Sequence, residues 1–505
     1  MPRSRSSAVT SPEAVADLLR IDARRPALPP EPFLIVGLGR AGISAGRALV
    51  GRRGADAVRA WDAAADAAQQ ARAAELRRLG VQVRLGGDGL ELLEGAATLV
   101  KSPGVGPEIP LVQAALARGL EVIDEFEIGW RLIEAPIVGI TGTKGKSTVS
   151  SLCMAIFAAH GLGPALCGNT DFGSAIGELV DAQPSSLVAE ISSYQLEFSQ
   201  KLVVDGAILT NLSPDHLNRH LTMADYAAAK RKLFVRGDTA VPLAVLNVDD
   251  QFGAGLVDEV SDRGGRVLRY GRDKSADYRI VTCRWDLRGA EIELETPAGR
   301  VELETRLPGP HNALNTTAAL ALADGLGLPR EQTLAALAAA SPVRGRFEVA
   351  DIDAPFDVII DLGVSPAGVA AGLEAARPIA TARGGRLIAV LSSVGRSAVE
   401  SGPRTGGLAR GLTDHLILAG SSYRGESRVP PIAALARGAR AASGGELEIV
   451  IDRREAIARA IRLARPGDVV MLIGRGHIER EATDVRGGFL DLADRRFAED
   501  LARNS

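Results

Sequence analysis

Short runs of mostly apolar residues recur along the chain, and each is followed by a polar or glycine-containing turn and then by a segment long enough for a helix. Runs of this length, without alternation, are typical of parallel strands buried on both faces. Strands that alternate with helices predict an α/β fold with doubly wound, mostly parallel sheets. The runs lie at residues 33–36, 57–62, 97–100, 119–124, 135–138, 187–190, 207–211, 356–360, 386–391, 415–419 and 469–473.

The most informative turn follows the run at 135–138 and reads Gly-Ile-Thr-Gly-Thr-Lys-Gly-Lys-Ser-Thr over residues 139–148. Glycines in a strand-to-helix turn let backbone N–H groups and a helix N-terminus point at one phosphate, while Lys146 adds a charge and Ser147 a hydroxyl for Mg²⁺. The spacing departs from GxxxxGK[ST], because residue 140 is isoleucine, so we expect a tighter turn. The phosphate-binding residues that we predict are Gly142, Thr143, Lys144, Gly145, Lys146, Ser147 and Thr148.

Lysine is rare in this chain: of 59 basic residues only seven are lysines. A lysine kept among so many arginines is expected where the chemistry needs a primary amine or a compact charge, which guanidinium cannot supply. The rarity of lysine therefore points to Lys146 and Lys230.

A second glycine turn, GLGRAG at residues 37–42, lies between two predicted strands, the second of which ends at Asp62. This is a βαβ nucleotide-binding pattern, with Asp62 placed to accept from a ribose hydroxyl. Taken alone, the pattern is compatible with an oxidoreductase that binds NAD, but the same geometry can hold another diphosphate.

Polar groups follow two successive strands of the middle region. Glu190 ends one strand, and His216 lies in the loop behind the next. Because ligands of open α/β sheets bind outside the carboxyl ends of the strands, we expect both groups to converge on the phosphate loop as Mg²⁺ ligands.

Length and composition agree with a soluble globular protein of several domains. At 505 residues the chain exceeds one core and predicts about three domains. Apolar residues make up 46% of the chain, and the net charge is −3. Because the charge is close to neutral, we predict no nucleic-acid partner. No run reaches the roughly 18 apolar residues that a membrane span needs. Without an export signal we expect the cytoplasm. The three cysteines, Cys153, Cys167 and Cys283, are interpreted as packing residues.

Seven motifs in order resemble those of the ATP-dependent Mur ligases. They are the phosphate loop and residues 190–197 (EISSYQLE), 215–216 (DH), 226–230 (YAAAK), 247–250 (NVDD), 309–315 (GPHNALN) and 345–348 (GRFE). The resemblance covers residues 32 to about 480 and implies three domains: a Rossmann-like domain at 31–127, a central P-loop ATPase domain at 128–342 and a Rossmann-like C-terminal domain at 343–505. Residues 1–30 are interpreted as a flexible lead-in.

The N-terminal third most resembles the D-glutamate-adding branch of the family, whose first domain binds UDP rather than NAD. The resemblance implies a UDP-N-acetylmuramoyl-L-alanine substrate and a monomeric ligase that acts in peptidoglycan precursor synthesis. The substrate-binding residues that it implies in the first two domains are Gly39, Arg40, Ala41, Asp62, Ser102, Pro103, Gly104 and Asn169.

The family's mechanism implies that ATP converts the substrate carboxylate to an acyl phosphate, which the amine of an amino acid then attacks. Lys146 and Ser147 would hold the β- and γ-phosphates and a first Mg²⁺ that Glu190 shares. His216 would bind a second Mg²⁺, and Lys230 would act as a carbamate between the ions. By the same likeness Asn315 and Arg346 would face adenine and phosphates, and Asp361 the ribose.

The C-terminal domain departs from the family pattern. Residues 361–368 (DLGVSPAG) lack the usual histidine or lysine, and no lysine follows Lys274. A carboxylate clamp for the acceptor would therefore need arginine, and Arg396 and Arg424 are the candidates. D-glutamate is the leading acceptor; L-glutamate, another polar amino acid, or a UDP-sugar-binding protein with impaired catalysis are the alternatives.

Overall fold

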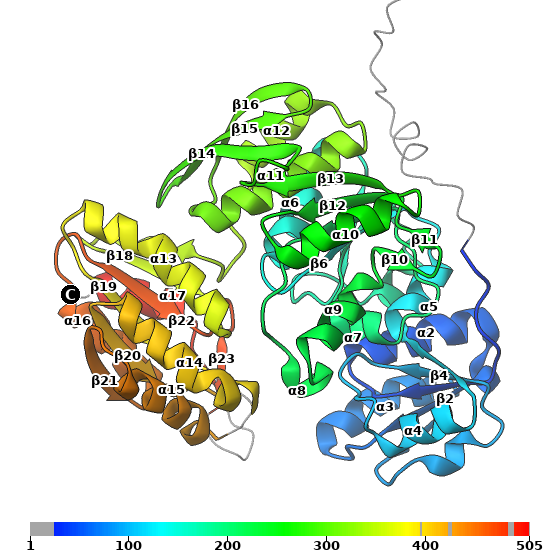
Figure 1. The fold of residues 1–505 in the computed structure, drawn as a ribbon. Helices are drawn as coiled ribbons and strands as arrows, with labels where there is room; N and C mark the ends of the chain where they lie inside the picture. Colours follow the sequence, from blue (N-terminus) through cyan, green and yellow to red (C-terminus); the bar gives the residue numbers. More distant parts are fainter. Residues whose placement is uncertain (1–24, 394–395, 423–426, 483–488, 504–505) are drawn as a thin grey trace, which may run out of the picture.

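The protein consists of three α/β units that follow one another along the chain (Figure 1). This computed structural model describes residues 25–393, 396–422, 427–482 and 489–503. Among these residues, no helix has both the length and the apolar character that crossing a membrane requires. The α/β class expected from the pattern of apolar runs is confirmed.

The first unit is a five-stranded parallel sheet in the order β3-β2-β1-β4-β5. The order reverses between β1 and β4, so the turns after these two strands meet at the carboxyl edge, where such sheets bind ligands. Its strands are β1 (Phe33–Val36), β2 (Val58–Asp62), β3 (Gln82–Leu85), β4 (Thr98–Lys101) and β5 (Glu121–Asp124); its helices are α2 (Arg40–Arg53), α3 (Ala67–Arg78), α4 (Pro110–Ala117) and α5 (Glu125–Leu132).

The second unit is built on a nine-stranded sheet in the order β16-β15-β14-β13-β12-β9-β6-β8-β7. Every residue of β6, β8, β9 and β12 is buried, which explains why their sequences are apolar without alternation. The strands are β6 (Ile137–Thr141), β7 (Pro164–Gly168), β8 (Ser186–Glu190), β9 (Gly206–Leu209), β12 (Leu243–Asn247), β13 (Arg266–Gly271), β14 (Tyr278–Asp286), β15 (Gly289–Thr296) and β16 (Gly299–Thr305).

Helices cover this sheet, and a long apolar helix, α11, is almost wholly buried in the largest core. The helices are α6 (Lys146–Ala159), α7 (Ser193–Glu197), α8 (Leu217–His220), α9 (Met223–Arg231), α10 (Gln251–Ser261), α11 (Pro310–Gly325) and α12 (Arg330–Ala339); a small hairpin pairs β10 (Val235–Arg236) with β11 (Thr239–Ala240).

Strands β14, β15 and β16 form an antiparallel extension that the sequence analysis did not anticipate. Their residues alternate between buried and exposed positions, as expected for a sheet with one solvated face. The extension reaches toward α13 of the third unit (Figure 1), where the Trp285 indole N–H donates to the Ala375 carbonyl at 3.3 Å.

The third unit is a six-stranded sheet in the order β17-β18-β22-β19-β20-β21, parallel except for β17. Its strands are β17 (Glu348–Val349), β18 (Asp357–Asp361), β19 (Leu387–Leu391), β20 (His415–Ala419), β21 (Glu446–Val450) and β22 (Val469–Ile473), with the pair β23 (Arg480–Ala482) and β24 (Phe489–Asp491); its helices are α13 (Pro366–Ala382), α14 (Arg396–Leu412), α15 (Val429–Ala441), α16 (Arg453–Leu463) and α17 (Asp494–Arg503).

Buried carboxylates on α5 join the first unit to the second. Glu127 accepts from the Lys201 backbone N–H at 2.9 Å and from the Arg131 guanidinium at 2.6 Å. Glu125 lies 3.4 Å from the Gln195 side-chain nitrogen, and burial raises its pKa to about 8. Ahead of β1, Arg25 donates to the Ala135 carbonyl at 3.0 Å, so residues near 25 also contact the second unit.

We predict that Glu125 makes stability fall as pH rises. A carboxyl group whose pKa is 4.5 when unfolded and about 8 when folded binds its proton more tightly in the native state. Its stabilising contribution is therefore complete below about pH 4.5 and is lost as pH rises toward about 8. In Glu125→Gln the melting temperature should fall less between about pH 5 and 8 than in wild type. The exposed Glu134→Gln is the control, and equal slopes for all three proteins would contradict the prediction.

Candidate functional site

The phosphate loop runs from β6 directly into α6. Gly142 has a φ of +146° and Gly145, the N-cap residue of α6, a φ of +87°. A Cβ atom on Gly142 would lie 1.9 Å from the Thr210 hydroxyl oxygen, so only glycine fits this turn. The loop thereby leaves the first N–H groups of α6 free of side-chain caps and available to an anion.

Two lysine amines meet at one backbone carbonyl inside the loop. Lys146 Nζ donates to the Gly142 oxygen at 3.1 Å, and Lys230 Nζ donates to the same oxygen at 2.9 Å. Lys230 is only 2% exposed. Burial lowers the pKa of both amines, most strongly that of Lys230, and the positive charge of Lys146 lowers the pKa of Lys230 further. An anion bound here would offset that repulsion.

A hydroxyl and a carboxylate lie together at the start of α6, where Ser147 Oγ donates to Glu190 Oε2 at 2.9 Å. Burial raises the pKa of Glu190, although the charge of Lys146 acts in the opposite direction. The described residues contain no cluster of three or more His, Cys, Asp or Glu side chains that could hold a metal. Mg²⁺ commonly binds through one or two carboxylates together with water and substrate phosphates, so Ser147 and Glu190 fit a site of that kind.

His216 precedes α8 on the same side of the loop. Its Nδ1 lies 3.2 Å from the Tyr194 hydroxyl, and 46% of its side chain is exposed. Partial burial of the ring lowers the pKa of His216 to about 4; the Asp215 carboxylate opposes this shift, and the positive charges of nearby lysines add to it. The imidazole is therefore neutral near pH 7 and can offer a nitrogen lone pair.

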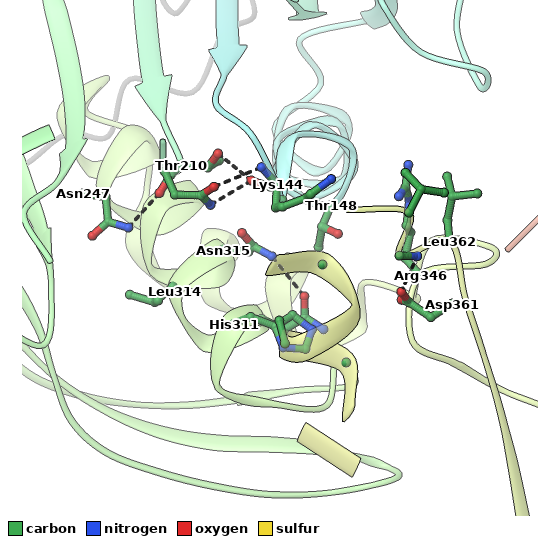
Figure 2. A pocket seen from close by; sticks show the side chains of 18 of the residues that line it. Lys144, Thr148, Thr210, Asn247, His311, Leu314, Asn315, Arg346, Asp361 and Leu362 are labelled. Carbon is green, nitrogen blue, oxygen red and sulfur yellow. Dashed lines mark hydrogen bonds between the residues drawn. The ribbon is translucent and has the colours of Figure 1, made fainter. Parts of the chain in front are cut away.

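A pocket lies beside the loop, between the second and third units (Figure 2). Its lining includes several predicted ATP-site residues: Lys144, Gly145, Thr148, Asn315, Arg346 and Asp361. Asp361 accepts from the backbone N–H groups of Phe347 and Gly363, at 2.8 and 2.7 Å. Arg346 Nε is buried, and no described residue accepts its hydrogen bond. This donor remains for a ligand.

The first unit presents its glycine turn at the carboxyl edge of β1. The Leu38 N–H donates to Asp62 at 2.6 Å, and the Ser102 hydroxyl donates to the Gly37 carbonyl at 2.6 Å. The space beside Gly39 is open, since a Cβ there would meet no atom within 4 Å. Asp62 and Ser102 thus shape the turn itself, and the adjacent residues Ala41, Pro103 and Gly104 lie at its edges.

Two predicted substrate residues lie at the junction of the first two units. The Arg40 guanidinium makes a paired contact with Glu178, with both N–O distances at 2.8 Å. The Asn169 backbone N–H donates to the Glu190 carbonyl at 2.7 Å, which places Asn169 next to the phosphate loop.

The predicted acceptor clamp lies largely outside what the structure describes. Arg396 is the first residue of α14, but its side chain is outside the described set, as is the whole of Arg424. What the structure does place here is a contact between units: His477 Nε2 lies 3.1 Å from Asp171 of the second unit.

Several site residues were not predicted from the sequence. Asp215 pairs with Lys144 at 3.2 Å, and the Asn211 side chain accepts from the Lys144 N–H at 3.0 Å. Tyr194 contacts His216. Asn211 and Asp215 follow β9 just as Glu190 ends β8, so their place at strand ends was an available signal, whereas the Tyr194 contact depends on how α7 and α8 pack.

Family models match along most of the described chain. A MurD-like N-terminal domain of the Mur ligases matches residues 31–124, the Mur ligase middle domain residues 140–323, and the Mur ligase glutamate ligase domain residues 345–476. UDP-N-acetylmuramoylalanine–D-glutamate ligase of Pelotomaculum thermopropionicum is 32% identical over 87% of this chain and 91% of its own length. The chain belongs to the Mur ligase family. Mur ligases are ATP-dependent amide-bond ligases that use Mg²⁺ and join an amino acid to a peptidoglycan precursor.

Relatives from more than one branch of the Mur ligases are similar to the chain. The D-glutamate ligase of Chromobacterium violaceum is 34% identical over 87% of the chain and 91% of its own length. A 2,6-diaminopimelate ligase of Aquifex aeolicus is 31% identical over 72% of the chain and 77% of its own length. The solved structure of UDP-N-acetylmuramate–alanine ligase from Thermotoga maritima has a TM-score of 0.59 at 20% identity, covering 94% of this chain and 99% of that one. The three-domain Mur ligase fold is thereby confirmed.

We predict that Lys146→Ala abolishes ATP turnover, because the loop loses the amine placed next to the phosphates. Binding of a UDP-N-acetylmuramoyl peptide should change by less than about threefold, since Lys146 lies outside the first unit. Phosphate release and calorimetric titration of the sugar nucleotide measure the two effects. A comparable loss of both would contradict this division of the sites.

Proposed function

We propose that this Mur ligase adds D-glutamate to UDP-N-acetylmuramoyl-L-alanine. The observation that carries the proposal is the match of residues 31–124 to the MurD-like N-terminal domain, because this unit would hold the sugar nucleotide. We place the reaction in the cytoplasm, in peptidoglycan precursor synthesis, with the enzyme as a monomer.

The first unit would bind UDP at the carboxyl edge of its sheet. The open side of the turn at Gly39 and Ala41 leaves room for the diphosphate, and Arg40 lies close enough to contribute charge if its pair with Glu178 rearranges. Asp62, Ser102, Pro103 and Gly104 would shape this site, and Asn169 would contact the muramoyl end, which must reach the phosphate loop.

The chemistry would proceed by activation of the alanyl carboxylate. A carboxylate oxygen attacks the γ-phosphorus of ATP and ADP leaves, which gives an acyl phosphate. The amine of D-glutamate attacks the acyl carbon and loses a proton, and phosphate departs with the electrons of the C–O bond. Lys146 and the N–H groups of α6 would hold the phosphates, since phosphoryl transfer depends mainly on positioning and charge neutralisation.

Four residues would hold the two Mg²⁺ ions that we propose. Ser147 and Glu190 are the first pair, supported by their contact at the start of α6. His216 and a carbamate on Lys230 are the second. When bound, Mg²⁺ would supply charge neutralisation on the phosphate oxygens.

The environment of Lys230 supports the carbamate. Its amine is 2% exposed and its pKa lies well below that of an ordinary lysine, so a neutral amine is available to combine with CO₂. Combination releases a proton and leaves an anion beside Lys146. The carbamate would therefore place a negative charge beside the Lys146 amine, where the two charges attract.

We predict that Lys230→Arg is as inactive as Lys230→Ala, because guanidinium cannot form a carbamate. Both variants should lose more than about a hundredfold in turnover, and Lys230→Ala should recover part of it when a short-chain carboxylate is added. Steady-state phosphate release measures this. Wild-type activity in Lys230→Arg would show that positive charge alone is required.

The acceptor would bind at the strand ends of the third unit, where ligands of such sheets are found. Ser421 and Ser422 follow β20 and are buried next to Glu481, which itself pairs with Arg428 at 3.1 Å. Arg396 and Arg424 remain our candidates for a carboxylate clamp, on sequence grounds. The unusual segment 361–368 keeps L-glutamate or another polar amino acid as a second candidate, and the similarity to diaminopimelate ligases favours testing that acceptor as well.

A phosphate-release screen of UDP-N-acetylmuramoyl-L-alanine against D- and L-amino acids tests the proposal. D-glutamate should give kcat/KM at least about tenfold above L-glutamate and 2,6-diaminopimelate. A screen won by a neutral apolar amino acid would contradict the assignment. Phosphate release that needs no amino acid, or no phosphate release with any amino acid, would identify a UDP-sugar-binding protein with impaired ligase chemistry. Tight binding of NAD by the first unit would favour an oxidoreductase.

A further inference from the structure

The four-residue helix α8 makes only a few backbone hydrogen bonds of its own, and side-chain contacts join it to other segments. The residues on either side, His216 and Leu221, are left-handed without being glycine, with φ values of 56° and 60°. Such conformations are unfavourable for residues other than glycine and persist only where the surroundings impose them. One such contact joins His220 Nε2 to the Ser193 hydroxyl at 2.9 Å. The position of His216 thus depends on what holds α8.

Arg219, in the middle of α8, contacts a residue of the first unit as well as residues of the second. Figure 1 shows α8 at the end of the second unit that lies next to the first. Its Nη2 donates to the Val105 carbonyl of the first unit at 2.8 Å. Its Nε donates to Glu197 of α7 at 3.0 Å, and the guanidinium lies over the Tyr194 ring, 5.1 Å from the centroid. The side chain is only 8% exposed. One guanidinium therefore joins three segments.

On the side of the first unit, Val105 belongs to the segment that packs against the glycine turn. The Val105 N–H donates to the Ser102 carbonyl at 3.0 Å, and Ser102 Oγ donates to the Gly37 carbonyl at 2.6 Å. A Cβ atom on Gly37 would lie 2.6 Å from Val105 Cγ2. The carbonyl that Arg219 contacts therefore belongs to a segment that packs directly against the glycine turn.

On the side of the second unit, the same arginine belongs to the turn that carries His216. The Arg219 backbone N–H donates to the His216 carbonyl at 3.0 Å. Tyr194, on which the guanidinium stacks, has its hydroxyl 3.2 Å from His216 Nδ1. Both the backbone and the ring of His216 are thus fixed by groups that Arg219 contacts.

We propose that Arg219 is a positioning residue that couples the sugar-nucleotide site to the ATP site. This coupling role rests on the proposed function, because it requires both the sugar nucleotide and ATP to bind this chain. Occupancy of the first glycine turn holds the Val105 carbonyl, Arg219 transmits this to α8, and His216 is held beside the phosphate loop. We expect lysine to replace arginine poorly here, because a compact ammonium lacks the planar fork that reaches both acceptors while the group lies over the Tyr194 ring.

Coupling between two ligands is measured directly by titrating one in the absence and presence of the other. A non-hydrolysable ATP analogue with Mg²⁺ is titrated calorimetrically into the full-length protein, with and without saturating UDP-N-acetylmuramoyl-L-alanine. In wild type the sugar nucleotide should tighten analogue binding by more than about fivefold. In Arg219→Lys the ratio should fall to within about twofold of one, while each ligand alone binds within about threefold of wild type.

Arg269→Lys is the matched control, because Arg269 makes a similar paired contact with Asp277 but joins no residue of the first unit. Its coupling ratio should equal that of wild type. Glu197→Gln weakens the anchor of Arg219 without removing the arginine and should lower the ratio part of the way, so it serves as a second variant if Arg219→Lys does not fold.

A coupling ratio that is unchanged in both Arg219→Lys and Glu197→Gln would overturn the inference. Weaker binding of each ligand alone, with the coupling ratio preserved, would overturn it too, because that result indicates a purely structural role. A wild type that binds both ligands without coupling also overturns it but leaves the proposed function intact. A wild type that does not bind UDP-N-acetylmuramoyl-L-alanine removes the proposed function itself.

Discussion

The Gly142 carbonyl accepts hydrogen bonds from the amines of both Lys146 and Lys230. Burial lowers the pKa of both amines, and the charge of Lys146 lowers that of Lys230 further. Such an arrangement is unfavourable for stability alone, and it is typical of sites that receive an anion. The left-handed glycines at 142 and 145, the Ser147–Glu190 contact and His216 lie in the segments around this pair of amines. The proposed ligase chemistry therefore centres on these two lysines.

The three units are joined in different ways. The first two share buried carboxylates on α5, the paired contact of Arg40 with Glu178 and the Arg219 bridge. Described contacts of the third unit with the second include the Trp285 indole with the Ala375 carbonyl and His477 with Asp171. Because the pocket is lined by Lys144 from one unit and by Arg346 and Asp361 from the other side, its shape depends on how the third unit lies against the second.

Much of the fold and part of the site could be predicted from the sequence. Apolar runs located most of the parallel strands that are buried on both faces, and the loop at 139–148 carries its chemistry in its own residues. The parallel strands β3, β7, β12, β13 and β21 were not predicted. Contacts between distant segments could not be predicted: Arg219 with Val105, or Tyr194 with His216, arises from tertiary packing that no local pattern encodes. The antiparallel extension β14–β16 was visible as alternation but was not recognised. The acceptor clamp at Arg396 and Arg424 stays a prediction.

Oxygen transfer from substrate to phosphate tests the central claim most directly, namely that the lysine-bearing loop activates a carboxylate as an acyl phosphate. UDP-N-acetylmuramoyl-L-alanine labelled with ¹⁸O in its carboxylate is turned over with ATP and D-glutamate, and the released phosphate is analysed by mass spectrometry. Because one carboxylate oxygen bridges to phosphorus and leaves with it, the account predicts one ¹⁸O atom in each phosphate. Unlabelled phosphate formed alongside the amide product would contradict it.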